Sequence, residues 1–266
     1  LFSGFVAEVE AGDIREVYAE AKANGFDFFT GVPCSFLTPL INATIDDPSS
    51  SYVAAASEGE AVAIASGAWL AGRQTVVMFQ NSGLGNAINP LTSLNYPFQI
   101  PTLVICTWRA GPGLKDEPQH ELMGEITPGL FDIMRIPRMA FPASDEAVAE
   151  TLQSARRMMD DTGLPAALIM QKDDVAPHKL TVGAAAKQMK KGFVTDHAAG
   201  DIDVSRYAVL EQLLDEISDH TAIIATTGKC GRELFTINDC PQHLYQVGSM
   251  GCAAGRRRAT KHAVPY

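Results

Sequence analysis

The amino-acid sequence predicts an α/β protein, with a doubly wound parallel sheet followed by the incomplete start of a second α/β domain. Two observations indicate this fold class. The apolar runs that resemble strands do not alternate with polar residues, which is typical of parallel strands covered on both faces. A segment with helical spacing separates each run from the next. Ligands of such sheets bind at the carboxyl ends of the strands.

Helices and strands are predicted in alternation along the first two thirds of the chain. Asp13 is the expected N-cap of the first helix, which ends before Gly25. A break at 31–35 opens the second helix. In order, the elements after the first helix are a strand at 26–30, a helix at 36–45, a strand at 52–55, an Ala-rich helix at 58–71, a strand at 75–79, a turn at 81–86 with a helix to about 94, a strand at 102–106, a helix at 145–160 and a strand at 166–170.

A change of pattern after residue 172 predicts the domain organisation. Residues 1–172 form the first domain, and residues 173–201, which lose the alternation of strands and helices, form a linker. Residues 202–266 begin a second α/β domain, with a helix near 204–217 and a strand near 222–225. The tail from about 254 is basic and has no pattern, so we interpret it as the product of a truncation or frame shift.

Composition excludes several classes of protein. The chain of 266 residues is 46% hydrophobic and 20% charged, which indicates a globular protein. Its 21 Lys and Arg against 31 Asp and Glu give a net charge of −10, which predicts no nucleic-acid partner. We expect no membrane segment and no signal peptide, five free thiols, and a cytoplasmic protein.

Glu58 is the most informative single residue, because it lies in an apolar segment directly after a predicted strand. A carboxylate in such surroundings needs a partner or a function. The Gly- and Asn-rich turn at 80–86 follows the next strand, so both features are expected at the same edge of the sheet. The alternative for Glu58 is an acidic residue stabilised by a helix N-terminus.

Three further segments resemble a known family. They are Gly-Val-Pro-Cys-Ser at 31–35, Gln-Asn-Ser-Gly-Leu-Gly-Asn at 80–86, and residues 108–120, which end in Lys-Asp-Glu-Pro-Gln-His. Together with Glu58, which a glycine follows nine positions later, they make the chain similar to the thiamine diphosphate-dependent 2-oxo acid decarboxylases over about residues 12–253. This resemblance implies the pyrimidine domain of the thiamine diphosphate-binding fold.

The resemblance also implies an activity and residue roles. It implies decarboxylation of 3-phosphonopyruvate to phosphonoacetaldehyde and carbon dioxide, in the biosynthesis of phosphonate natural products such as antibiotics. Glu58 is the implied catalytic carboxylate, hydrogen-bonded to the pyrimidine N1′ atom, while the cofactor supplies the carbanion. The other implied cofactor contacts are Pro33, Asn81, Gly228, Gly248, Ser249 and Met250, which is the wedge between the cofactor rings.

Substrate contacts are assigned through the same resemblance. Arg109 offers a planar fork to a phosphonate, and Lys115 and His120 add point charges. The implied contacts are Ser35, Gln80, Ser82, Arg109, Lys115 and His120. A solvated loop at 115–117 and ordinary turn chemistry at 81–85 remain alternatives. Cys34 has no supporting histidine, so we expect no nucleophilic role for it.

The family holds its cofactor through Mg²⁺ bound by a Gly-Asp-Gly motif and a later Asn, and this chain contains neither. We assign no metal ligand and expect weak cofactor binding, doubtful activity and poor packing of residues 202–255 unless another chain supplies the missing part. The resemblance implies a homo-oligomer with shared active sites. Two other functions stay open: a sulfopyruvate decarboxylase, and a non-catalytic pyrimidine-domain subunit or remnant that needs a partner chain.

Overall fold

The computed structural model describes residues 12–182, 203–218, 220–225 and 228–245. The chain divides into two compact units, Leu1–Ala185 and Ala186–Tyr266, and each is treated by itself below. Within the described residues, no helix is both long enough and apolar enough to span a membrane.

A six-stranded sheet forms the centre of the first unit. Its strand order is β2-β1-β3-β4-β6-β5, and all neighbouring strands are parallel. β4 and β6 are buried along their whole length, which explains why their sequences do not alternate. The predicted doubly wound parallel sheet is therefore confirmed. The strands are β1 (Phe26–Gly31), β2 (Ser51–Ala54), β3 (Gln74–Gln80), β4 (Leu103–Thr107), β5 (Arg138–Ala140) and β6 (Ala166–Met170).

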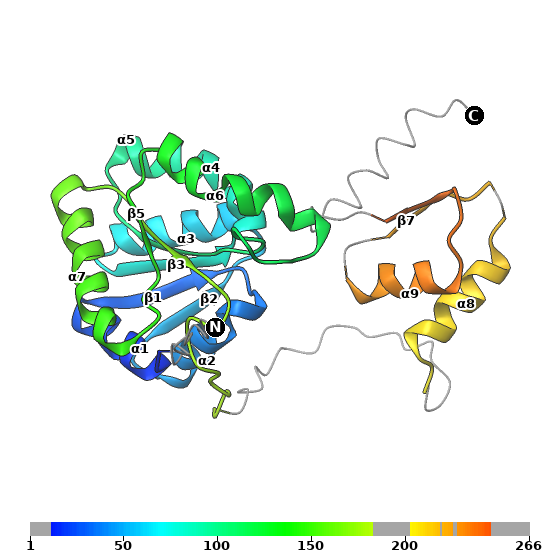
Figure 1. Ribbon diagram of the computed structural model, residues 1–266, viewed down its shortest axis with the longest axis horizontal. Helices are drawn as coiled ribbons and strands as arrows, with labels where there is room; N and C mark the ends of the chain where they lie inside the picture. The colour runs from blue at the N-terminus through cyan, green and yellow to red at the C-terminus, as the bar shows by residue number, and fades with distance from the viewer. Residues whose placement is uncertain (1–11, 183–202, 219, 226–227, 246–266) are drawn as a thin grey trace, which may run out of the picture. The chain divides into compact units, whose positions relative to one another are not determined.

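Helices cover both faces of this sheet (Figure 1). α1 (Ile14–Ala23), α2 (Thr38–Asp46) and α7 (Asp145–Thr162) pack against one face, in a core that includes Phe26 and Leu152. α3 (Glu58–Leu70), α4 (Leu84–Pro90) and α6 (Glu121–Ile133) pack against the other, around Phe79 and Phe131. Two separate hydrophobic cores, one on each face, hold the sheet between them. Short 3₁₀ turns precede α2, α4 and α6, at Ser35–Leu37, Asn81–Gly83 and Pro118–His120.

The start of α3 is fixed by the side chains of Ser57, its N-cap, and Glu60. The hydroxyl of Ser57 accepts a hydrogen bond from the backbone N–H of Glu60 at 3.3 Å, and the carboxylate of Glu60 accepts one from the N–H of Ala56 at 2.6 Å. The first bond satisfies a donor that the first turn of a helix leaves unpaired, and the second ties the N–H of Ala56, just before the N-cap, to the helix. Glu60 therefore has a local structural role, and Glu58 becomes the first residue of the helix.

Two regions differ from the sequence prediction. The single helix expected up to residue 94 is divided into α4, a π-helical turn (Leu91–Asn95) and α5 (Tyr96–Phe98). Pro90 at the end of α4 has no N–H to donate, so the hydrogen bond to the carbonyl four residues earlier is missing there, and a π-helical turn follows. α6 and β5 were not predicted, because α6 contains Pro128 and two glycines and β5 has only 3 residues.

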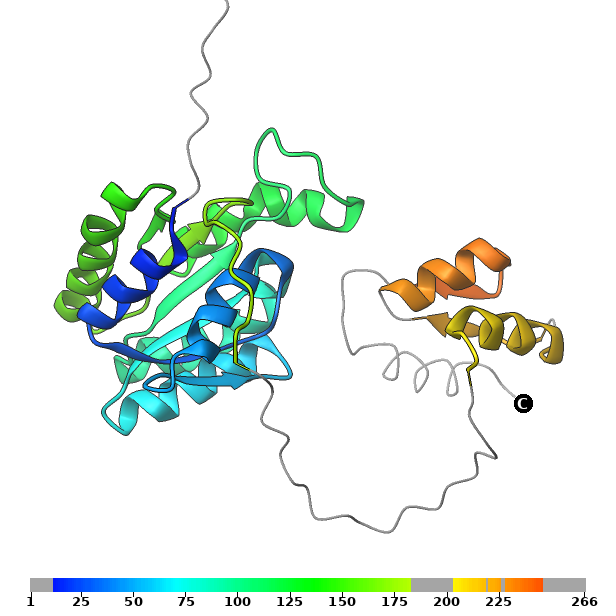
Figure 2. The same ribbon diagram turned by 90° about the horizontal axis from the view of Figure 1, so that it is seen from below.

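Residues 173–182 pack on the first unit, although we expected a linker from residue 173. Val175 pairs with Gly12 in an isolated parallel bridge. Further along, Asp46 at the end of α2 accepts hydrogen bonds from the N–H groups of Thr181 at 3.0 Å and Val182 at 2.8 Å. The Nε2 atom of His178 lies 2.9 Å from the same carboxylate. The segment 173–182, which we call the strap, therefore runs along α2 (Figure 2).

The strap contacts of Asp46 should depend on pH. Desolvation acts to raise the pKa of Asp46, but the hydrogen bonds from Val182, His178 and Thr181 outweigh it and lower the pKa to about 2. A depressed pKa means that the contribution is complete above the ordinary value near 4 and is lost as the pH falls through about 2. We expect the amide resonances of Thr181 and Val182 to titrate together with a midpoint near pH 2 in nuclear magnetic resonance spectra. Asp46→Asn should abolish this titration, and a midpoint near pH 4 would contradict it.

The described part of the second unit is small. It contains α8 (Arg206–Glu216), β7 (Ile223–Ala225), α9 (Lys229–Ile237) and β8 (His243–Tyr245), and β7 and β8 pair in parallel. The buried hydrophobic cluster described here consists of Leu210, Ala225 and Leu234. Arg206 donates from Nε and Nη2 to the carboxylate of Glu233, both at 2.6 Å, and so connects α8 with α9.

Candidate active site

The carboxyl ends of β1, β3 and β4 meet at one edge of the sheet, because the three strands are parallel neighbours. The segments that follow them are 32–35, 81–86 and 108–120. These are the segments in which the sequence placed most of its site residues. The fold therefore brings these separate motifs to a common edge, where open α/β sheets bind their ligands.

Glu58 lies at this edge as a buried carboxylate, with only 5% of its surface exposed. The side-chain N–H of Asn86 donates to its Oε2 atom at 2.8 Å. A Cβ atom at Gly83 would collide with the carboxyl group, so the glycine makes room for it. Glu58 forms no ion pair with any residue that the structure describes. The hydrogen-bond partner of the Glu58 carboxylate is thus a neutral amide, not a cation.

Asn81 is completely buried, and its amide is used within the protein. Its Nδ2 atom donates to the carbonyl of Arg109 and to the hydroxyl of Thr127, both at 3.0 Å. Its Oδ1 atom accepts from the N–H of Arg109 at 3.2 Å. Asn81 therefore connects the end of β3 with the end of β4, and the cofactor contact that the resemblance implies for it stays a prediction.

Gln80 and Ser82 lie together with Cys34. The thiol of Cys34 donates to Oε1 of Gln80 at 3.2 Å, and the Nε2 atom of Gln80 donates to the hydroxyl of Ser82. The thiol is also 3.7 Å from the hydroxyl of Thr107 at the end of β4. This polar row crosses the carboxyl ends of β1, β3 and β4. It gives Cys34 hydrogen-bonding partners without a histidine that could activate it.

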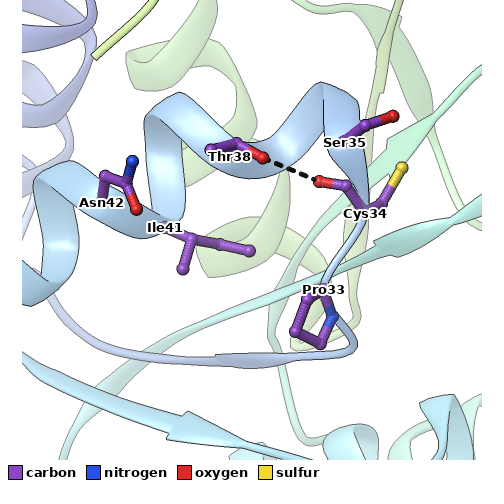
Figure 3. A pocket seen from close by; sticks show the side chains of 6 residues that line it. All are labelled: Pro33, Cys34, Ser35, Thr38, Ile41 and Asn42. Atoms are coloured by element: carbon purple, nitrogen blue, oxygen red, sulfur yellow. Dashed lines mark hydrogen bonds between the residues drawn. The ribbon is translucent and has the colours of Figure 1, made fainter. Parts of the chain in front are cut away.

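Pro33 and Ser35 line a cavity of about 360 Å³ beside the start of α2 (Figure 3). Thr38, the first residue of α2, and Ile41, about one helical turn further along, also line it. The hydroxyl of Thr38 donates to the carbonyl of Cys34 at 3.5 Å and so keeps the loop against the helix. The complete lining is Pro33, Cys34, Ser35, Thr38, Ile41 and Asn42.

Arg109 is held in place by an acidic residue that the sequence analysis did not assign. Its Nε and Nη2 atoms donate to the two carboxylate oxygens of Asp116, both at 2.6 Å, and its guanidinium lies 4.9 Å from the ring centre of Phe36. Asp116 also accepts from the backbone N–H groups of Ala110 at 3.2 Å and Glu117 at 2.8 Å. The Arg109 guanidinium keeps the pKa of Asp116 well below its usual range. The carboxylate thus fixes both the arginine and its loop.

Asp116→Asn should loosen the loop 109–117. The substitution preserves shape but removes the charge, so we expect hydrogen-exchange protection at the amides of Ala110 and Glu117 to fall about tenfold, as for one lost charge-assisted hydrogen bond. The matched control is Asp132→Asn, which removes the exposed pair between Asp132 and Arg138. Exposed pairs contribute little, so equal effects of the two substitutions would contradict this prediction.

His120 is buried beside Arg109, whereas Lys115 is exposed. The Nδ1 atom of His120 has no hydrogen-bond partner in the structure. Burial, and then the charge of Arg109, lowers the pKa of His120 below its usual value. The imidazole is therefore neutral at pH 7, which differs from the point charge expected from the sequence, and its buried Nδ1 atom is unpaired among the described residues. Lys115 can reach an anion only from the solvent side.

The remaining predicted contacts lie in the second unit or outside the described residues. Gly228 begins α9 with a φ angle of 122°, which favours glycine. Gly248, Ser249 and Met250 fall outside the described residues. The part of the chain that the structure describes contains no group of three side chains that could hold a metal ion.

Sequence reasoning missed four residues of this site, namely Phe36, Gly83, Asn86 and Asp116. Gly83 and Asn86 belong to a motif that was noticed, but no local pattern shows that they contact Glu58. Asp116 follows Lys115 and precedes Glu117, so the charged run suggested a solvated loop. Only the hairpin-like return of 109–116 shows that Asp116 faces Arg109 instead.

Comparisons with known proteins agree with this arrangement. Residues 15–132 match the family model described as thiamine pyrophosphate enzyme, N-terminal TPP binding domain. The matched residues include the buried acidic residue at the carboxyl edge of the sheet. Together with the similarity to a sulfopyruvate decarboxylase subunit alpha given below, this match shows that the chain belongs to the thiamine pyrophosphate enzyme family.

The chain is also similar to curated decarboxylases. It is 43% identical to phosphonopyruvate decarboxylase of Streptomyces viridochromogenes and 42% identical to that of Streptomyces hygroscopicus; each match covers 86% of this chain and 58% of the relative. It is 36% identical to sulfopyruvate decarboxylase subunit alpha of Methanocaldococcus jannaschii, over 58% of this chain and 89% of that subunit. The chain therefore spans a little over half the length of the two Streptomyces relatives.

Proposed function

We propose that this chain supplies the pyrimidine-binding part of a carboxy-lyase that converts 3-phosphonopyruvate to phosphonoacetaldehyde and carbon dioxide. The observation that carries the proposal is the buried carboxylate of Glu58, which has no cation to neutralise it among the described residues. A buried carboxylate without a counter-ion is costly. A ligand that shares a proton with it would remove this cost, which is typical of a functional site.

The geometry around Glu58 fits thiamine diphosphate. Oε2 is occupied by Asn86, whereas Oε1 accepts no hydrogen bond from the described residues and lies against Gly83. One oxygen is therefore available for the N1′ atom of the aminopyrimidine ring. When bound, thiamine diphosphate supplies the carbanion that attacks a ketone and the electron sink that permits loss of carbon dioxide.

The other site residues would hold the substrate. Two N–H groups of Arg109 are used by Asp116, and the rest of its fork remains for a phosphonate. Gln80 and Ser82 offer neutral hydrogen-bond donors. His120 offers a ring nitrogen that has no hydrogen-bond partner among the described residues. Ser35 and Lys115 are proposed to complete the contacts from the cavity rim and from solvent. Pro33, Asn81, Gly228, Gly248, Ser249 and Met250 remain proposed cofactor contacts.

Several finer points belong to this proposal. Thiamine diphosphate would be held together with Mg²⁺, because its diphosphate needs a hard cation with oxygen ligands. Active sites would be shared between the subunits of a homo-oligomer in the cytoplasm. The similarity to two phosphonopyruvate decarboxylases at 43% and 42% identity favours a phosphonate pathway, including antibiotic biosynthesis.

Sulfopyruvate is the second candidate substrate, because the chain covers 89% of a sulfopyruvate decarboxylase subunit alpha. Sulfonate and phosphonate have similar shapes and differ in charge and proton count, so the same donors serve both. Arg109 favours the more highly charged phosphonate.

Decarboxylation assays test these proposals. The 266-residue chain and the longest reading frame that contains it would be assayed with thiamine diphosphate, Mg²⁺ and each of the two substrates. We expect faster turnover of phosphonopyruvate, measured as phosphonoacetaldehyde formed. Faster turnover of sulfopyruvate would reverse the choice of substrate. Cofactor binding without any turnover would indicate a non-catalytic subunit.

A further inference from the structure

We propose that Asn86 is a positioning residue for Glu58, and that it selects the carboxylate oxygen that faces the ligand. The inference rests on the proposed function, because it assumes that Glu58 binds the pyrimidine ring. Asn86 carries none of the roles assigned above to the cofactor or substrate. Its contact with Glu58 joins α4 to α3 across 28 positions of the chain.

The first part of the argument is the geometry of the carboxylate. The Nδ2 atom of Asn86 donates to Oε2 of Glu58 at 2.8 Å, which is a normal length for a charge-assisted hydrogen bond. Gly83 contacts the same carboxyl group from the turn before α4. The carboxylate is thus restrained at Oε2 by a donor and at Oε1 by the backbone of Gly83, which offers Oε1 no hydrogen bond. Oε1 is the remaining oxygen.

Rigid packing behind Asn86 keeps this donor in place. A Cβ atom at Gly59 would lie only 2.8 Å from the backbone oxygen of Asn86, so α3 and α4 approach each other with almost no space between their backbones. Leu84 and Ala87, on either side of Asn86, are completely buried. The amide therefore projects from an anchored backbone toward Glu58. Positioning of this kind is more precise than a contact from a mobile loop.

The chemistry of an amide suits this task. A lysine or arginine at position 86 would form an ion pair with Glu58 and hold its charge permanently. An asparagine restrains one oxygen through a hydrogen bond but leaves the net negative charge of the carboxylate in place. The charge then remains available to a ring nitrogen at Oε1.

Three variants separate positioning from general stability. Asn86→Ala removes the donor. Asn86→Asp keeps the shape but replaces the donor with an acceptor that repels Glu58. Asn89→Ala is the matched control, because Asn89 is an exposed residue of the same helix whose side chain forms no hydrogen bond with the described residues. Thermal unfolding shows whether each variant remains folded.

The first measurement needs no cofactor. Infrared difference spectra between the 266-residue chain and its Glu58→Gln variant isolate the carboxylate stretching bands of Glu58. We expect these bands to shift in Asn86→Ala and Asn86→Asp, because a hydrogen bond to Oε2 is lost, and to stay unchanged in Asn89→Ala. Bands that are identical in all three variants would overturn the positioning role, whatever the protein catalyses.

The second measurement uses the longest reading frame with bound thiamine diphosphate and Mg²⁺. Exchange of the cofactor C2 proton with deuterium, followed by nuclear magnetic resonance, reports on Glu58 without any substrate. We expect exchange to slow by about 10- to 100-fold in Asn86→Ala, which corresponds to loss of a hydrogen bond to a charged group, and to stay unchanged in Asn89→Ala. Exchange as fast as in the unchanged protein, while Glu58→Gln abolishes it, would overturn the inference. Absence of cofactor binding in the unchanged protein would instead refute the proposed function, and the infrared result would then decide the role of Asn86.

Discussion

Replacement of Glu58 by glutamine is expected to reduce decarboxylation by about 10²- to 10⁴-fold, the range for loss of a general acid–base group. Glutamine has nearly the same shape and can still accept the hydrogen bond from Asn86. It cannot carry the negative charge that a pyrimidine ring nitrogen requires. The measurement is the rate of phosphonoacetaldehyde formation, together with thermal unfolding to show that the fold is retained.

Glu60→Gln is the matched control for this substitution. Glu60 lies two residues further along the same helix, and its carboxylate accepts from the N–H of Ala56 at the start of α3. A glutamine performs the same capping function, so turnover should remain close to that of the unchanged protein. If Glu58→Gln and Glu60→Gln have equal activities, Glu58 is not the catalytic carboxylate.

Gly31→Ala is expected to cause the largest loss of stability, about 3 kcal/mol, or to prevent folding. Gly31 is the last residue of β1 and pairs with Met78 in β3. A Cβ atom at this position would collide with the carbonyl oxygen of Met78, which already accepts a hydrogen bond from Val32 at 3.0 Å. The collision is with backbone in the middle of the sheet, so no side chain can move away to relieve it. Urea unfolding at equilibrium measures the change.

Gly67→Ala is the control for Gly31→Ala: it makes the same chemical change at a position where the new Cβ atom meets no neighbour. Gly67 lies in α3, and a Cβ atom there meets nothing within 4 Å. Alanine favours the helical conformation by about 1 kcal/mol over glycine, so this variant should be slightly more stable than the unchanged chain. A loss of stability at position 67 as large as that at position 31 would show that the collision is not the cause.

Much of the first unit was predicted from local sequence. Asp13 caps α1 as expected and accepts from the N–H of Arg15 at 2.9 Å. The predicted strand at 166–170 agrees with β6 to the residue, because an unbroken apolar run between two turns has one reading in a covered parallel sheet. α6 was missed since Pro128 and two glycines obscure its periodicity.

The candidate site was predicted only in part, because some of its features are local in the sequence and others are not. The sequence identified the segments at the ends of β1, β3 and β4, since a polar turn after an apolar run is a local feature. It did not identify how the side chains would pair. The structure adds that Asn81 connects two strand ends and that Arg109, expected as a planar fork for a phosphonate, is paired with Asp116.

The sequence by itself determined the alternation of strands and helices, the edge of the sheet that carries the site, and the acidic residue at its centre. These features depend on periodicity and burial, which neighbouring residues encode. Only the tertiary structure decided that Asn86 holds Glu58, that Asp116 holds Arg109, and that the strap binds Asp46. Val182 in the strap lies 136 positions from Asp46 along the chain. A contact across such a separation depends on how the crossovers bring distant segments together, and residue type alone does not specify which donor meets which acceptor.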